Sequence, residues 1–411
     1  MKKTIYIIVS LIMMISSVLL FSSCERIKDL FSSGEDYVSS DGLLFTLSDD
    51  ESYYIVAGMG NCTDTDIVIP LTYKEKPVKE IGEGSFKSNQ NITSIKLHNE
   101  ITVIGDKAFY YCGKLSRVVL GNGLNEIGDE AFYNCDKIES IFIPKSVTEI
   151  GDSAFLQCSK LERIEVDENN SAYKSVDGTL YNKSGSVLIQ YPVGREEKNL
   201  TLPKGVREIQ KEAFSLCKNI KKVELPIGVE TIGDSAFEGC ENLEHINLPT
   251  TLIHIGDRAF SSCSGLTEII IPDGVTKIGV RCFIECSSLT NLKLPANLVT
   301  IGQYAFYKCS SINEIVIPDT VKDIGDDAFG YCTSLESILI CTTVKTIGDG
   351  AFFNCDQAFL YIDGNESAWE KIKSENSFYD ISNYKTYIYS ASRPLVNGNY
   401  WHYVEGEIVV W

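Results

Sequence analysis

Apolar residues recur along most of this chain with a spacing of 23 residues, which is far longer than the period of a single helix or strand. An isoleucine, usually followed by glycine, marks each repeat. The marking residues are Ile81, Ile104, Ile127, Ile150, Ile209, Ile232, Ile255, Ile278, Ile301, Ile324 and Ile347. A unit this small cannot bury its own apolar side chains, so the period predicts a solenoid of about eleven stacked coils.

Each repeat has the pattern of two short extended pieces separated by turns. In residues 243–249, Ile246 and Leu248 alternate with polar neighbours, which places both on the inner face of a strand that Pro249 ends. A second extended piece reaches Ile255 before a glycine turn. Asp257 directly follows this glycine and comes shortly before Ala259 and Phe260, as an N-cap comes before a short helical turn. The pattern therefore predicts α/β coils with short parallel strands and short helical turns.

Two columns of the repeat predict the dry centre of the solenoid. Phenylalanine occurs in all eleven repeats, from Phe86 to Phe352, and cysteine occurs in ten. The cysteines are Cys112, Cys135, Cys158, Cys217, Cys240, Cys263, Cys286, Cys309, Cys332 and Cys355. Residues at one point of every coil share one environment, and cysteine is often fully buried. We expect a ladder of packed thiols; disulfides and a metal site are the alternatives, but parallel side chains do not give the disulfide torsion.

The consensus LxxIxLPxxVxxIGxxAFxxCxx resembles the BspA-type leucine-rich repeat family of bacterial surface antigens. The resemblance covers residues from about Ile81 to Cys355, and extends to an insertion at 173–192 and to the aromatic C-terminal end. It implies a right-handed solenoid with parallel strands, displayed on a bacterial surface. In some relatives it also implies adhesion to host matrix proteins or to other cells.

The period is interrupted once and ends before the C-terminus. We expect the N-terminal cap at 41–80, the repeats at 81–356 and a C-terminal cap at 357–411. An insertion at about 167–202 contains a predicted hairpin around residues 182–185, which is either decoration or a ligand contact. Aromatic residues crowd the C-terminal segment, from Tyr384 to Trp411. They are typical of a cap, with a stacking platform for sugars as the alternative.

The first residues are typical of a bacterial lipoprotein signal. Lys2 and Lys3 precede an apolar run at 5–21, and Ser22 and Ser23 stand directly before Cys24. Cleavage after residue 23 would leave Cys24 as the lipid-bearing N-terminus, followed by a polar tether at 24–40. The alternatives are an ordinary signal peptide and an uncleaved N-terminal anchor. We expect a lipid-anchored protein of the cell envelope, exposed on the surface.

The charge narrows the range of partners. The formal net charge is -19, and loss of residues 1–23 would remove two lysines and no acid, which gives -21. A nucleic acid would be repelled, because no basic stretch reverses the charge locally. We expect a partner that is an extracellular or envelope protein, with a host matrix protein or a glycan among the candidates.

The outer face of the first strand is the predicted binding surface. Its residues alternate with the inward pair of each coil, and many are apolar, which is typical of an interaction surface but also of ordinary sheet propensity. A second outward column adds variable charge. The candidate residues are Arg117, Val119, Phe142, Arg163, Lys222, His245, Ile270, Val316 and Leu339.

The sequence contains none of the common catalytic motifs. It has no HExxH, GxSxG or GxGxxG pattern, and its four histidines are scattered. We expect no enzyme activity, no cofactor and no metal site. The predicted function is therefore non-enzymatic adhesion or ligand capture at the cell surface. The alternatives are a structural or assembly component of the envelope and, less favoured, a glycan hydrolase.

Overall fold

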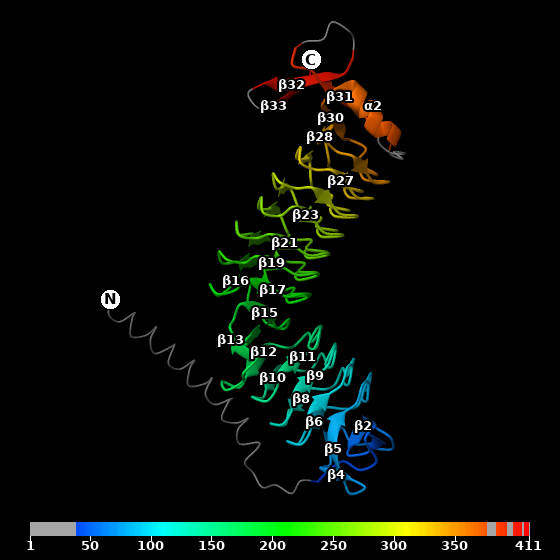
Figure 1. The fold of residues 1–411 in the computed structure, drawn as a ribbon, viewed down its shortest axis with the longest axis vertical. Helices are drawn as coiled ribbons and strands as arrows, with labels where there is room; N and C mark the ends of the chain where they lie inside the picture. Colours follow the sequence, from blue (N-terminus) through cyan, green and yellow to red (C-terminus); the bar gives the residue numbers. More distant parts are fainter. Residues whose placement is uncertain (1–37, 376–383, 393–397, 405–406, 411) are drawn as a thin grey trace, which may run out of the picture. The chain divides into compact units, whose positions relative to one another are not determined.

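The computed structural model describes residues 38–375, 384–392, 398–404 and 407–410. The chain from Asp41 to Trp411 is one compact unit, and residues 38–40 belong to a separate N-terminal unit. Figure 1 shows the larger unit as a stack of coils, with β2 (Tyr54–Gly58) near one end and β31 (Thr386–Tyr389) near the other. The predicted leucine-rich repeat solenoid is confirmed. The predicted lipidation site, Cys24, lies outside the described residues.

The first strand of each coil runs beside its equivalents in neighbouring coils. The described residues contain 14 such strands, so the stack is slightly longer than the predicted eleven coils. Strands β12, β30 and β31 account for the difference. The set comprises β3 (Asp66–Val68), β6 (Ser94–Lys96), β8 (Arg117–Val119), β10 (Ser140–Ile143), β12 (Arg163–Val166), β16 (Asn199–Thr201), β18 (Lys222–Glu224), β20 (His245–Asn247), β22 (Glu268–Ile270), β24 (Asn291–Lys293), β26 (Glu314–Val316), β28 (Ser337–Cys341), β30 (Phe359–Asp363) and β31.

A second parallel ladder runs along another side of the stack. Within three runs of this ladder, successive marking isoleucines pair in register, as Ile232 does with Ile255; the pairing breaks between Ile150 and Ile209, at the insertion, and between Ile255 and Ile278. The glycine that follows lets the backbone of the preceding coil come close; a Cβ on Gly256 would meet Asp234 N at 2.5 Å. The strands are β5 (Lys76–Ile81), β7 (Val103–Ile104), β9 (Glu126–Ile127), β11 (Glu149–Ile150), β15 (Val187–Gln190), β17 (Glu208–Ile209), β19 (Thr231–Ile232), β21 (His254–Ile255), β23 (Lys277–Ile278), β25 (Thr300–Ile301), β27 (Asp323–Ile324) and β29 (Thr346–Ile347).

The segments after these second strands are turns, and the predicted short helical turns do not form there. Arg258 and Ser262 in one such turn have φ of 56°, and their N–H groups donate to carbonyls of the next coil. The repeated aspartate does not cap its own turn. Asp234 Oδ1 instead accepts from the N–H of Asp257, one coil onward, at 2.8 Å. The helical turns do not form because the turn N–H groups point at the neighbouring coil. Their hydrogen bonds are made there and not within a helix.

Phenylalanine rings and thiols fill the centre of the coils, as the two columns predict. The rings of Phe237 and Phe260 stack with centroids 5.3 Å apart, and both side chains are fully buried. The thiol of Cys263 donates to the carbonyl oxygen of Phe237 at 3.1 Å, and the same bond recurs along the column. All 13 cysteines in the described residues are free thiols. The ladder is therefore built by packing and S–H···O bonds, without cross-links.

The insertion at about 167–202, where the period is interrupted, forms part of the stack and does not project from it. Strands β13 (Tyr173–Val176) and β14 (Thr179–Asn182) form a hairpin, and β14 pairs antiparallel with β15 across residues 183–186. Strand β15 then joins the second ladder, and Tyr191 stacks on Phe214 at 5.1 Å in place of a phenylalanine. The buried core separates here into two clusters, one of which ends at Leu180 while the other begins at Tyr181.

Other strands close the described ends of the stack. Strand β1 (Leu44–Leu47) pairs with β2, and β4 (Thr72–Tyr73) pairs with β5. At the other end, α2 (Glu366–Glu375) follows β30, and β32 (Tyr400–Val404) pairs with β31 and β33 (Glu407–Val410). Trp401 is fully buried and donates from Nε1 to the carbonyl oxygen of Ile362 at 3.1 Å. Trp401 therefore packs as a cap residue and is not open to a sugar.

Candidate binding surface

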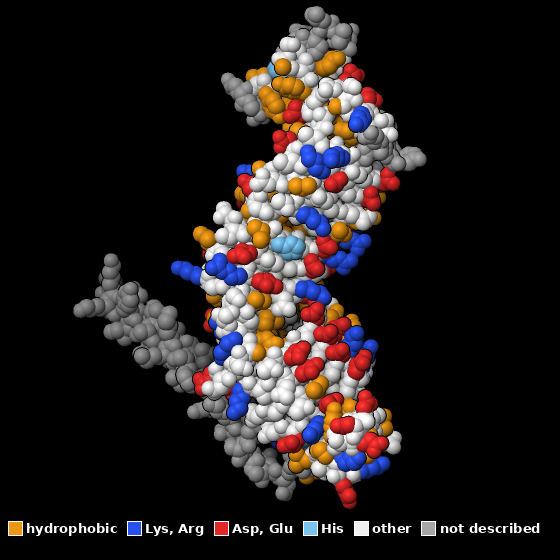
Figure 2. Space-filling model, in the orientation of Figure 1, with side chains coloured by type: hydrophobic (Ala, Val, Ile, Leu, Met, Phe, Trp, Pro, Cys, Tyr) orange, Lys and Arg blue, Asp and Glu red, His pale blue; other side chains and the backbone are white. Residues whose placement is uncertain are grey.

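The outward residues of the first strands form a surface that we call the strand face. Strand alternation places it there: in β22, Ile269 and the following Ile271 are buried, whereas Ile270 between them is 51% exposed. In β26 the same alternation leaves Val316 half exposed between two buried isoleucines. Figure 2 shows acidic and basic side chains intermingled along the stack and apolar side chains gathered towards its C-terminal end.

The structure brings some of the predicted site residues together and separates others. Lys222 and His245 are register partners in β18 and β20, and both are exposed. Arg163 lies on β12 and makes a 3.9 Å ion pair with Glu165, which itself pairs in register with the half-buried Phe142. Arg117 and Val119 lie on β8, which belongs to a different hydrogen-bonded ladder. The strand face is therefore a series of short patches.

Leu339 is the one predicted site residue that the structure removes from the surface. Its side chain is only 7% exposed and packs in a cluster with Tyr387 and Trp401. The prediction was wrong because it considered the repeat alone. Tyr387 and Trp401 follow Leu339 by 48 and 62 positions, after the period has ended, so the repeat pattern contains no sign of them.

A hollow of about 620 Å³ opens on the strand face at β16, β18 and β20. It contains two of the predicted residues, Lys222 and His245, together with apolar groups. The most exposed of these is Ile227, at 81%. The full lining is Thr201, Leu202, Lys204, Lys222, Val223, Glu224, Leu225, Pro226, Ile227, His245 and Asn247.

Contacts within β18 and between neighbouring coils hold the polar groups of this hollow in place. Lys222 Nζ lies 2.8 Å from Glu224 Oε1, and this hydrogen bond lowers the pKa of the Glu224 carboxyl below its ordinary value. The Asn247 side chain accepts from Leu225 N–H at 2.7 Å and donates to Leu225 O at 3.0 Å. These contacts fix the polar side chains that line the hollow. Ile227 lies beside them and offers apolar surface to a ligand.

Ile227 was not among the predicted site residues, although the sequence contains a sign of it. The position after the strand-ending proline is polar or small in six other repeats that carry this proline, as in Lys204, Thr250 and Asp273, whereas the first coil has the half-exposed Leu71 there. An isoleucine at a repeat position that faces solvent does not contribute to the core of its own repeat. Comparison down this column identifies Ile227 as an exception.

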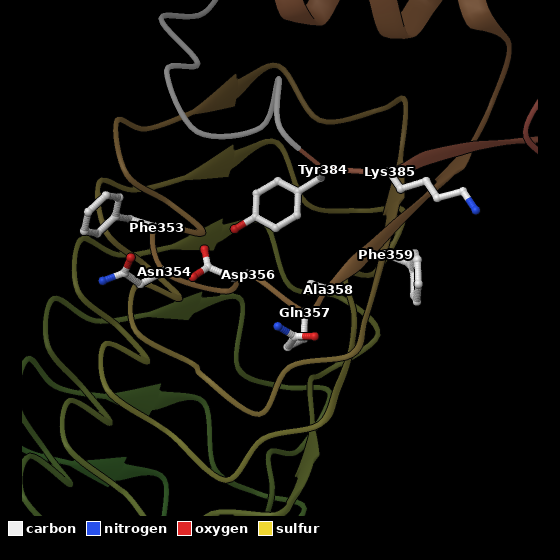
Figure 3. Close-up of a pocket in the computed structure, with 8 residues that line it drawn as sticks. All are labelled: Phe353, Asn354, Asp356, Gln357, Ala358, Phe359, Tyr384 and Lys385. Atoms are coloured by element: carbon white, nitrogen blue, oxygen red, sulfur yellow. The ribbon is translucent and has the colours of Figure 1, made fainter.

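A second hollow, of about 360 Å³, lies at the C-terminal end of the repeats (Figure 3). Tyr384 leans over it and donates from its hydroxyl to Phe352 O at 2.6 Å. Asp356 and Gln357 are exposed in it, and Phe353 stands at its edge. These groups come from a turn of the last repeat and from the segment that enters β31, so repeat patterning alone does not predict them.

The described residues offer little for catalysis or metal binding. In this part of the chain no three His, Cys, Asp or Glu side chains converge as metal ligands. The ladder thiols are buried, and burial raises the pKa of Cys112 and Cys240 to about 12, so the nucleophilic thiolate is disfavoured. Among the described helices, none has the length and apolar character needed to cross a membrane.

Comparison with known proteins gives the same architecture. A leucine-rich repeat protein from Eubacterium ventriosum is 26% identical, with a TM-score of 0.63 over 77% of this chain and 94% of its own. The pneumococcal vaccine antigen PcpA is 22% identical, with a TM-score of 0.57 over 85% of this chain and 97% of its own. A search of curated proteins finds no match.

The repeats themselves match a described family over most of the chain. The profile is that of the BspA type leucine rich repeat region, matched at residues 73–183, 195–313 and 254–385. Proteins of this type are typically found on bacterial surfaces, and their folds are generally binding scaffolds. The resemblance inferred from the consensus is thus confirmed, and the chain belongs to the BspA-type leucine-rich repeat family.

Proposed function

We propose that this protein is a non-enzymatic, lipid-anchored surface protein that captures a partner protein on its strand face. The observation that carries the proposal is the hollow at β16, β18 and β20, where Ile227 is 81% exposed beside Lys222 and His245. A large exposed apolar side chain gains free energy when a partner covers it and removes it from water. Interface hot spots typically combine such buried apolar anchors with a polar rim.

The shape of the solenoid supports this role. A stack of coils offers a long, preformed surface, so binding a partner does not require the scaffold to order itself first. Short strands with alternating exposed residues present many positions that vary without harm to the core. The polar residues around Ile227 would fix the orientation of a bound segment, while Ile227 supplies the apolar contact.

The test is partner capture followed by a measured affinity. The mature protein, immobilised through its C-terminus, is exposed to solubilised envelope proteins and to extracellular-matrix proteins, and the dissociation constant of each captured protein is measured. Ile227→Asp is expected to weaken binding at least tenfold, since it places a charge where an apolar contact forms. The matched control is Lys293→Glu, another exposed residue of the strand face, outside the hollow. Equal affinity of Ile227→Asp and the unaltered protein would contradict the proposal.

A further inference from the structure

Four aromatic side chains form a continuous row on the turn side of the C-terminal repeats. We call this row the aromatic ribbon, and it consists of Tyr304, Tyr307, Tyr331 and Phe353. Successive ring centroids lie 5.3, 5.2 and 5.5 Å apart, and each pair meets edge to face. The ribbon therefore crosses three neighbouring coils without a gap.

The turn geometry holds these rings in register at the surface. Tyr304 and Tyr331 have positive φ, of 57° and 62°, and the N–H of Tyr331 donates to Phe353 O in the next coil at 2.7 Å. Because such bonds join every coil to its neighbour, the rings are spaced by the coil rise. The buried phenylalanine column lies beneath them, and Phe353 remains 40% exposed.

The ribbon ends at the C-terminal hollow of about 360 Å³. Figure 3 shows Phe353 at one edge of the hollow, Asn354 and Asp356 beside it, and Gln357 further along. Amide and carboxylate side chains offer hydrogen-bond donors and acceptors in pairs, which matches the paired hydroxyls of a sugar ring. Aromatic rings thus lead directly to a group of planar polar side chains.

From this arrangement we infer that the ribbon and hollow bind a neutral oligosaccharide. The face of an aromatic ring is negative, so it attracts the weakly positive C–H groups on one face of a pyranose. The hydroxyls at the edges of that sugar would bond to Asn354, Asp356 and Gln357. A short chain of sugars fits, since the three coils are separated by two steps of about 4.8 Å each and the ribbon spans roughly 10 Å along the stack.

Charge at the hollow favours a neutral sugar over an acidic one, although a cation, Arg281, lies over the ring of Tyr304 at the far end of the ribbon, at 5.2 Å. Lys308, the cation beside Tyr307, forms an ion pair with Glu285 at 3.0 Å. Lys385 stands over the rings of Phe359 and Tyr387, and Figure 3 shows it pointing away from Asp356. The carboxylate of Asp356 in the hollow would repel a uronate or sulfate group.

The experiment is titration of the mature protein with cellotetraose, chitotetraose and mannotetraose, with a heparin tetrasaccharide as the acidic comparison. We expect at least one neutral tetrasaccharide to bind and heparin not to. The double variant Tyr331→Ala/Phe353→Ala is expected to lose about tenfold or more in affinity, whereas Tyr331→Phe keeps the ring and stays within about threefold. Unfolding midpoints show whether each variant is folded.

Tyr111→Ala is the matched control. Tyr111 occupies the same repeat column as Tyr331 and has φ of 60°, but it packs against Tyr110 and Tyr133 far along the stack from the hollow. It should leave sugar affinity unchanged, as should Ile227→Asp, which separates this site from the strand face. The inference is overturned if no neutral tetrasaccharide binds, if only heparin binds, if Tyr111→Ala weakens binding as much as the double variant, or if the double variant binds normally.

Discussion

At the residue scale, the repeat predicts which side chains are buried but not the bonds they make. The columns of phenylalanine and cysteine are in the core, as a shared environment requires. Of the ten ladder thiols, Cys217, which follows Tyr191 by 26 residues, bonds to Ser215 O. The other nine bond to the carbonyl of a phenylalanine 26 residues earlier, a partner that depends on how one coil sits on the last. The same holds for the aspartate that reaches the next coil. Such partners are set by contacts between coils, which a consensus for one coil does not contain.

The buried thiols predict that stability falls in alkaline solution. Burial raises the pKa of Cys112, Cys158 and Cys240 from about 9 to about 12. Their contribution to the unfolding free energy is complete below pH 9 and is lost as the pH rises from 9 to about 12, since thiols of the unfolded chain ionise first. At pH 10, ionisation of each of these thiols in the unfolded chain lowers the unfolding free energy by about 1.4 kcal/mol.

The measurement is chemical unfolding at pH 8 and pH 10 under reducing conditions, in wild type and in Cys112→Ala/Cys158→Ala/Cys240→Ala. The triple variant starts less stable, but its loss between the two pH values is expected to be about 4 kcal/mol smaller. An identical loss in both proteins would show that the thiols do not titrate as their burial requires.

At the element scale, strands follow the period closely wherever the period is intact, and the interrupted region departs from it. The predicted hairpin around residues 182–185 does form, yet its second strand, β15, joins the parallel ladder and is followed by Tyr191, which enters the aromatic column. A region without periodicity gives no register, so its place in the stack was not predictable. Leu339 illustrates the same point, because elements beyond the repeats cover it.

Asn170 is the side chain that anchors this region. It is fully buried, donates to Pro144 O and Val147 O, and accepts from the N–H groups of Ala172 and Tyr173, each at 2.8 Å. Asn170→Ala would leave all four backbone groups without that partner, and we expect a loss of about 3 kcal/mol or more in unfolding free energy.

Asn169→Ala is the comparison, since Asn169 is exposed and its side-chain amide donates to the nearby Asp167 at 3.2 Å. Its expected cost is within about 0.5 kcal/mol. Equal effects of the two substitutions, measured by urea unfolding, would refute the anchoring role of Asn170.

At the scale of the whole molecule, the fold class and family could be predicted from the sequence because the same 23-residue pattern recurs in most of the repeats. The binding surface could be predicted only in outline: Lys222 and His245 share a hollow, whereas Arg117 lies on a separate ladder. Hollows arise where coils deviate from one another, and Ile227 is such a deviation. What distinguishes one member of a repeat family from another is therefore found in the exceptions to its consensus.

The proposed anchor depends on a single residue before the solenoid. Cys24→Ala is expected to move the protein from the membrane fraction to the soluble fraction of fractionated cells, because the acyl chains would no longer be attached. Ser23→Thr, which leaves the cysteine in place, serves as the control. Retention of Cys24→Ala in the membrane fraction, with an unprocessed mass, would identify an uncleaved anchor instead.

The proposed function places a partner protein on the strand face at β16, β18 and β20. Hydrogen–deuterium exchange of the mature protein, with and without a captured partner, measures which strands that partner covers. We predict slower exchange in peptides that cover residues 199–204, 222–227 and 245–247, and no change at the turns of the same coils. Protection confined to those turns, or to the ends of the stack, would contradict the claim.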